Sequence, residues 1–138
     1  MWSLSGTQLT LVDQVAGQRF TNVTYGSAAP PLVTPVDPTK NKSGVSSASS
    51  INFTLTSDLT IVDPWTVEID RGGEFELALT YNGAAVFEPL FQGEDSDVSA
   101  VAGGYNVTID PQSPFNPSQS VTVRVTALDN LGQAATVA

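Results

Sequence analysis

The sequence predicts an all-β fold, an antiparallel β-sandwich, and three observations support this prediction. Apolar and polar residues alternate with a period of two in several short segments, most clearly in 51–56, 105–110 and 121–129. Clusters of glycine, proline and asparagine separate these segments, as turns separate strands. No segment of about 12 residues combines helix-forming residues with apolar residues at helical spacing, so we expect no helix.

Residues 1–28 are predicted to form an N-terminal extended arm or hairpin, followed by the sandwich in residues 29–138. Residues 8–12 and 19–25 have the composition of two short strands. Two strands bury too little apolar surface to fold alone, so the arm must pack on another surface, and we interpret it as an assembly segment. Its predicted partner-binding residues are Trp2, Leu4, Leu9, Leu11 and Phe20. Trp2 is expected in an unstructured terminus, either inserted into a neighbouring subunit or packed back on its own domain.

The segments that follow alternate between connectors and strands. Four prolines in residues 27–38 predict an extended connector, because proline fixes φ and removes a hydrogen-bond donor. Residues 39–50 are small and polar and predict a loop. Residues 51–56 predict a strand, and Asp63-Pro64 separates two further predicted strands, 59–62 and 65–70.

The second half of the chain is predicted to begin with a hairpin. Residues 74–81 and 84–87 flank Asn82-Gly83, a pair that favours a type I′ turn because both central residues then have positive φ. Residues 93–100 predict an acidic loop. After the strand 105–110 and a proline-rich turn at 111–118, the last strand alternates Val121, Val123, Val125 and Ala127 with mostly polar residues, as a half-buried strand does.

Composition excludes several classes of function. The chain has 14 acidic and 5 basic residues, a formal charge of −9, which opposes nucleic-acid binding. It has no Cys and no His, so a serine- or cysteine-type hydrolase triad cannot be assembled. No run of about 18 apolar residues predicts a membrane span. We therefore predict a protein that is not an enzyme, with neither nucleic acid nor membrane as a partner.

Two groups of residues have both a functional and a structural interpretation. Glu94, Asp95, Asp97 and Asp129 suggest a Ca²⁺ site; otherwise the first three form a solvated acidic loop and Asp129 forms a turn. No other cofactor is predicted. The aromatic residues Trp65, Tyr81, Phe87 and Tyr105 have the chemistry of a sugar-stacking platform, but aromatics on alternating strands are more often part of the core.

Five segments along the chain carry a family resemblance. They are Val62-Asp-Pro-Trp-Thr-Val-Glu-Ile69, residues 87–93, Gly103-Gly-Tyr-Asn-Val-Thr-Ile-Asp-Pro111, Phe115-Asn-Pro117 and residues 121–132. In this order they resemble Ig-like β-sandwich modules of tailed-bacteriophage virion proteins and the related Ig-like domains of bacterial adhesins. The resemblance covers about residues 30–138, while 72–79 is longer than the family pattern and residues 1–28 have no counterpart.

The resemblance implies a structural or adhesive module with no catalytic residues to carry over. We expect a bacteriophage virion structural protein at the particle surface, either a capsid decoration or a head, neck or tail accessory. It would be anchored through its arm to other virion proteins, as a homo-oligomer or on capsid or tail subunits. The alternative is a carbohydrate- or cell-surface-binding adhesion module with a host-surface glycan as its partner.

Overall fold

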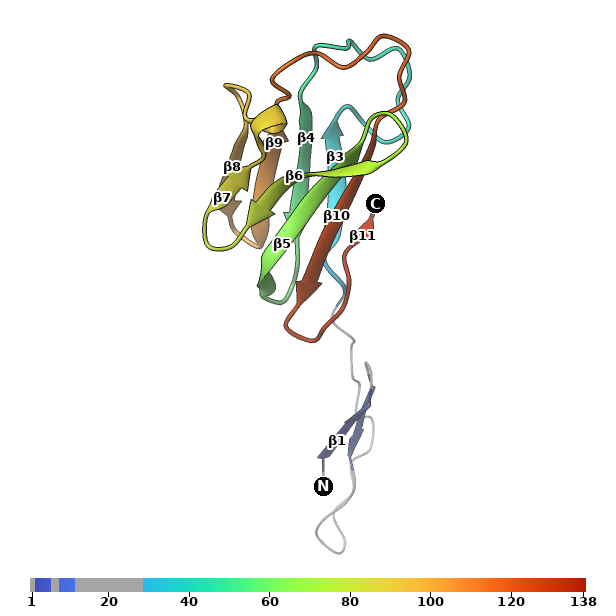
Figure 1. The fold of residues 1–138 in the computed structure, drawn as a ribbon. Coiled ribbons are helices and arrows are strands. Elements are labelled where there is room, and N and C mark those ends of the chain that lie inside the picture. Colours follow the sequence, from blue (N-terminus) through green and yellow to red (C-terminus); the bar gives the residue numbers. More distant parts are fainter. Residues whose placement is uncertain (1, 6–7, 12–28) are drawn as a thin grey trace, which may run out of the picture.

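The computed structural model describes residues 2–5, 8–11 and 29–138, and the last of these ranges forms two packed β-sheets (Figure 1). The first sheet has the order β10-β5-β6-β7, and the second has the order β11-β3-β4-β9-β8. Neighbouring strands are antiparallel except β11 and β3, which are parallel. The predicted β-sandwich is confirmed. The four strands of the first sheet are β5 (Ile61–Asp70), β6 (Phe75–Tyr81), β7 (Ala85–Phe87) and β10 (Thr122–Asp129), and those of the second are β3 (Leu32–Asp37), β4 (Ile51–Thr56), β8 (Asp97–Val101), β9 (Gly104–Ile109) and β11 (Thr136–Val137).

The strand order is that of an Ig-like sandwich. The series β3-β4-β9-β8 follows the A-B-E-D order of the immunoglobulin fold, and β10-β5-β6-β7 follows F-C-C′-C″. The segment that leads into the final strand, β11, meets β10 at an isolated bridge between Leu128 and Ala134. It then leaves β10 and pairs with β3 in the other sheet.

The core lies between the two sheets. Trp65, Val67 and Ile69 alternate along β5 and are fully buried, and Trp65 occupies the strand on which Ig-like domains carry their core tryptophan. Fully burying one such side chain contributes about 1.5–3 kcal/mol. The buried hydrophobic residues are Val33, Phe53, Leu55, Ile61, Trp65, Val67, Ile69, Ala78, Leu79, Phe91, Val107, Ile109 and Ala127.

Two prolines, Pro35 and Pro64, lie inside strands although the sequence predicted a connector at the first and a break between two strands at the second. Residues 32–37 form β3, although a connector was expected, and Pro35 is tolerated because β11 covers only Leu32 and Val33 and the register with β4 is irregular between Pro35 and Asp37. Similarly, β5 continues through Asp63-Pro64. Its pairing with β6 begins only at Trp65, and its register with β10 shifts across these residues, so Pro64 interrupts no regular ladder.

The predicted hairpin is confirmed, but its turn type is wrong. Tyr81 pairs with Ala85 across a three-residue loop, and only Gly83 in that loop has positive φ, at 75°. The acidic loop prediction for 93–100 is also partly wrong, because its second half forms β8. The residues of β8 are small or polar, which gives a weak strand pattern. Between β7 and β8 lies the 3₁₀ turn η1 (Pro89–Phe91).

The described N-terminal residues form a separate two-stranded sheet, which we call the N-terminal ribbon. It pairs β1 (Trp2–Ser5) with β2 (Gln8–Leu11), and neither strand is hydrogen-bonded to either sheet of the sandwich. The expectation that Trp2 lies in an unstructured terminus is therefore wrong, since Trp2 begins β1. The predicted strand at 19–25, including Phe20, lies outside the described residues. In the described part of the chain, no helix is long and apolar enough to cross a membrane.

Candidate interaction surface

The four predicted Ca²⁺ ligands do not share one site. Asp97 pairs with Thr108, whose other neighbour is Asn52 near the start of β4, whereas Asp129 pairs with Ile61 at the start of β5. Since β4 and β5 run in opposite directions through the sandwich, these pairs lie at opposite ends of it (Figure 1). Within the described ranges, no group of three or more Asp, Glu, His or Cys side chains is arranged to hold a metal ion.

Asp129 instead holds the turn after β10. The residue is 1% exposed, and its carboxylate accepts three hydrogen bonds, from the backbone N–H groups of Leu131 and Gln133 at 3.0 and 2.9 Å and from Gln133 Nε2 at 2.8 Å. Gly132, with φ of 77°, completes the turn. These donors leave little of the carboxylate for a cation, so the turn-forming interpretation fits this residue.

The acidic loop of residues 93–97 is fastened to Asp110. The Gly93 N–H donates to the Asp110 carbonyl at 2.8 Å, and the Asp95 N–H donates to its carboxylate at 3.2 Å. The Asp110 N–H in turn donates to Ser96 Oγ at 2.8 Å. A side chain at Gly93 would overlap Asp110, which explains why glycine starts this loop. The carboxylates of Glu94, Asp95 and Asp97 belong to residues exposed to solvent.

The aromatic residues form part of the core, as the more common interpretation predicted. Trp65 is fully buried, and its ring centroid lies 5.0 Å from that of Tyr81 and 5.1 Å from that of Tyr105. Phe87 packs against the core, half-buried. Burial raises the pKa of the Tyr105 hydroxyl, with smaller electrostatic contributions from Tyr81 and Asp63 in the same direction. Because Trp65 is inaccessible, these four residues do not form an exposed sugar-stacking platform.

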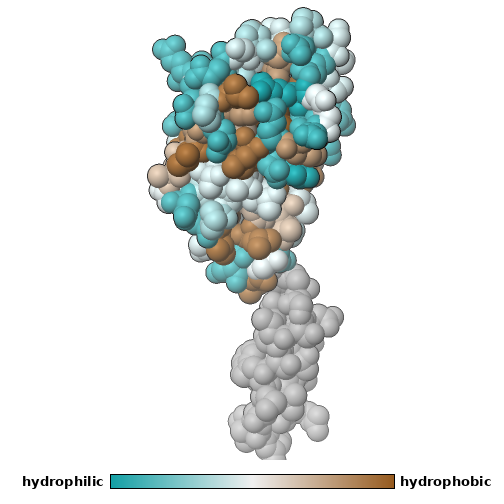
Figure 2. Space-filling model, in the orientation of Figure 1, coloured by the Kyte–Doolittle hydropathy of each residue, from teal (hydrophilic) through white to brown (hydrophobic). Residues whose placement is uncertain are grey.

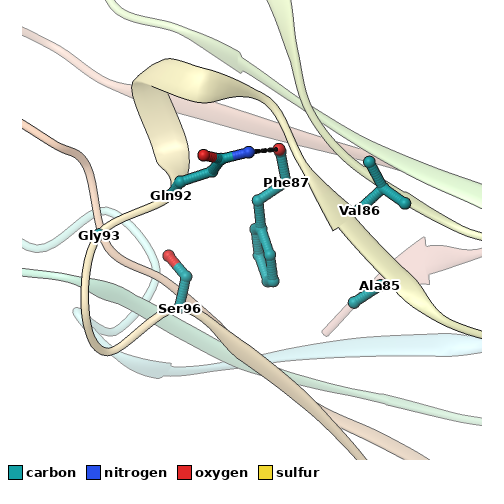
Figure 3. Close-up of a pocket in the computed structure, with 6 residues that line it drawn as sticks. All are labelled: Ala85, Val86, Phe87, Gln92, Gly93 and Ser96. Carbon is teal, nitrogen blue, oxygen red and sulfur yellow. Dashed lines mark hydrogen bonds between the residues drawn. The ribbon is translucent and has the colours of Figure 1, made fainter.

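A shallow pocket opens at the side of the sandwich where the edge strands β7 and β8 approach each other. It has a volume of about 380 Å³ and is lined by Ala85, Val86, Phe87, Gln92, Gly93 and Ser96 (Figure 3). The Gln92 amide donates to the Phe87 carbonyl at 2.7 Å across its rim. None of the six lining residues carries a charge. The pocket thus offers hydrogen-bonding groups and one aromatic ring, with no group that would act as an acid or base at neutral pH.

The outer face of the four-stranded sheet carries an ion pair beside exposed apolar residues. Arg124 on β10 lies 3.9 Å above the Phe75 ring and pairs with Glu68 at 2.9 Å. Leu77 is opposite Glu68 and is 40% exposed. Figure 2 shows hydrophobic patches separated by polar surface on this face. The sequence analysis did not identify this cluster, although Arg124 is the only charged residue between Val121 and Leu128.

One edge of the same sheet is open. Ala127 and Asp129 direct their backbone groups away from β5, since the Ala127 carbonyl accepts from the Ala135 N–H at 2.9 Å and the Asp129 N–H donates to the Gln133 carbonyl at 3.1 Å. Strand alternation gives Val123 and Val125 the same orientation. No described strand pairs with them there. We call the outer side of β10 over residues 122–126 the open edge.

The register of the N-terminal ribbon brings the predicted partner-binding positions together. Trp2 is opposite Leu11 and Leu4 is opposite Leu9, so these four positions fall on one face of the two-stranded sheet. Ser3, Ser5, Gln8 and Thr10 fall on the other face. This pairing was not predicted from the sequence, because residues 8–12 were expected to pair with 19–25.

Comparison with known proteins adds no relative: the chain matches no protein-family model, no curated protein and no solved structure.

Proposed function

We propose that the chain is a non-enzymatic structural protein of a tailed-bacteriophage virion that displays an Ig-like sandwich and is anchored to other virion proteins through its N-terminal ribbon. The observation that carries the proposal is that the sandwich and the N-terminal ribbon form separate sheets. The buried hydrophobic core of the described residues runs from Val33 to Ala127, whereas the ribbon forms its own sheet. A two-stranded sheet with four large apolar positions on one face needs a surface on which to bury them.

The sequence resemblance supplies the virion assignment, and the Ig-like strand order agrees with it. Modules of this architecture serve many functions, so the assignment depends on the resemblance as well as on the fold. In this proposal the sandwich projects from the particle surface, and assembly takes the place of a reaction mechanism. Strand addition supplies backbone hydrogen bonds, and alternate side-chain positions supply specificity.

Quantitative mass spectrometry of purified particles from the source tests the proposal. We expect the chain at a fixed ratio to the major shell protein, and that ratio separates a shell decoration from a neck or tail ring. Absence from particles would refute the proposal and favour the adhesion module, which a glycan array would then test. A second experiment compares the full chain with a variant lacking residues 1–28. Incorporation of the truncated chain at full occupancy would contradict the anchoring role.

A further inference from the structure

The edges of the two sheets are protected very unequally. Proteins prevent unwanted strand pairing by making edge strands short, by placing charges or prolines on them, or by covering them. The edge strand β7 has three residues, and the Gln92 side chain occupies its Phe87 carbonyl. At the other sheet, β8 begins with exposed Asp97 after Glu94 and Asp95, and β3 beyond its short contact with β11 contains Pro35 and Asp37.

The open edge of β10 has none of these protections. Residues 122–126 contain no proline and no acidic residue. Their single charge, Arg124, lies on the outer face and reaches across the sheet to Glu68 and the Phe75 ring, so it points away from the edge. Among the described edge strands of the sandwich, this stretch has neither a cap nor a charge that points beyond the edge.

Inward-facing residues of β10 are buried only where another segment lies beside this edge. The inward-facing residues Ala127 and Asp129 are buried where residues 133–135 pass beside the strand. Val123 and Val125 face the same core but are only half-buried, because no described segment lies beyond them. An additional strand at the open edge would therefore complete both the backbone ladder and the apolar layer.

We propose that the open edge receives the N-terminal ribbon of a second copy of this chain, by antiparallel or parallel strand addition. The proposal rests on the assembly function above and names its partner. The apolar face of the ribbon, formed by the positions of Trp2, Leu4, Leu9 and Leu11, would continue the inner layer beside Val123 and Val125, and its polar face would continue the outer one. Among the described strands, β1 and β2 pair only with each other, so either could add to the open edge as a further strand.

Charge favours the ribbon over a second sandwich as the occupant. Residues 1–28 contain one acidic and one basic residue, Asp13 and Arg19, so the whole formal charge of −9 lies on residues 29–138. Two sandwiches joined edge to edge would bring like charges together. An antiparallel pair of β10 strands centred on Arg124 would also place two arginines opposite each other, which is destabilising. A neutral ribbon meets neither obstacle.

The absence of cysteine allows a clean test by disulfide trapping. Two preparations of the full chain are mixed under oxidising conditions, one carrying Thr126→Cys and the other carrying either Ser3→Cys or Thr10→Cys. All three positions lie on the polar face that the proposal makes continuous, one on each of β10, β1 and β2. The matched control replaces Thr126→Cys by Ser99→Cys, which is exposed on the acidic edge strand β8.

We expect the mixed disulfide between Thr126→Cys and one of the two ribbon variants to form several-fold faster than that of the Ser99→Cys control, with the linked peptides identified by mass spectrometry. Equal rates would overturn the proposal. So would a disulfide that forms only within a single chain carrying both Thr10→Cys and Thr126→Cys, since the ribbon would then cover its own sandwich. Such a failure would leave the virion assignment standing, because that assignment is tested by the composition of particles.

Discussion

Replacing Asp129 by alanine should destabilise the sandwich strongly, although the residue lies in a surface turn. Its carboxylate accepts hydrogen bonds from two backbone N–H groups and one side-chain amide at 2.8–3.0 Å. A hydrogen bond to a charged group contributes about 1.5–3 kcal/mol. The turn borders solvent, with Leu131 50% exposed, so water replaces part of what is lost. We therefore expect Asp129→Ala to lower the free energy of unfolding by about 3 kcal/mol, or the Tm by about 12 °C for a domain of this size.

Asp129→Asn is the conservative comparison. Its side-chain carbonyl can still accept from Leu131 and Gln133, and the Gln133 amide can rotate to accept from the new NH₂ group. We expect a loss of about 1 kcal/mol, because the bonds are no longer assisted by charge. Asp58→Ala is the matched control, since Asp58 is exposed in the loop that precedes β5. That change should stay within about 0.5 kcal/mol of the unmodified protein.

Urea unfolding followed by near-ultraviolet circular dichroism measures these differences, with an unchanged m-value showing that the same surface is exposed on unfolding. Each variant is measured with EDTA and with excess calcium. Equal stability of Asp129→Ala and Asp58→Ala would contradict the role of the carboxylate in the turn. Stabilisation of the unmodified protein by calcium that Asp129→Ala abolishes would also contradict it, since this result would restore Asp129 as a metal ligand.

Three further predictions concern the core and two titrating groups. Leu55→Ala should cost about 2–5 kcal/mol in urea unfolding, since Leu55 is fully buried, and an effect below 1 kcal/mol would contradict the core assignment. The Gly72 and Gly73 N–H groups lower the pKa of Asp70 below 3.8, so its contribution to stability is present above the ordinary carboxyl pKa and is lost as pH falls through the lowered one. NMR titration should show this, and Asp70→Asn should flatten the acid dependence of the urea midpoint. Burial raises the pKa of Tyr105 above 10.0, so stability falls as alkaline pH ionises this tyrosine in the unfolded chain. Tyr105→Phe should reduce that fall in urea unfolding at alkaline pH.

The strands with a clear alternation of apolar and polar residues were predictable from the sequence, and the short or proline-containing strands were not. β4, β9 and β10 alternate clearly because one face of each lies on the core and the other lies in solvent. β3 contains Pro35, β8 contains small residues, and β11 has only two residues. β11 pairs with β3 at only two residues, and the register of β3 with β4 is irregular after Pro35, so the sheet constrains these sequences less. The missing information was therefore which neighbours these strands pair with.

The candidate surface depended still more on tertiary structure. The cluster of Arg124, Glu68 and Phe75 joins three strands, and its ion pair links residues 56 positions apart in the sequence. The two interpretations of Asp129 were separated only by its partners across the turn. The apolar face of the ribbon required the register that sets Leu4 opposite Leu9. In each case the sequence showed the residue types, but the contacts between them depended on the fold.

The path of the last nine residues links the fold to the proposed assembly. Residues 133–135 cover the lower part of β10, but β11 then pairs with Leu32 and Val33 of β3 instead of continuing along β10. In the usual Ig-like arrangement the last strand belongs to the sheet that contains F and C. Because β11 changes sheets, residues 122–126 have no described partner strand on the side that faces away from β5. A contact between this edge and a ribbon from another copy would use two different surfaces, so two copies could exchange ribbons reciprocally in a dimer, or successive copies could extend the assembly into a ring or a filament.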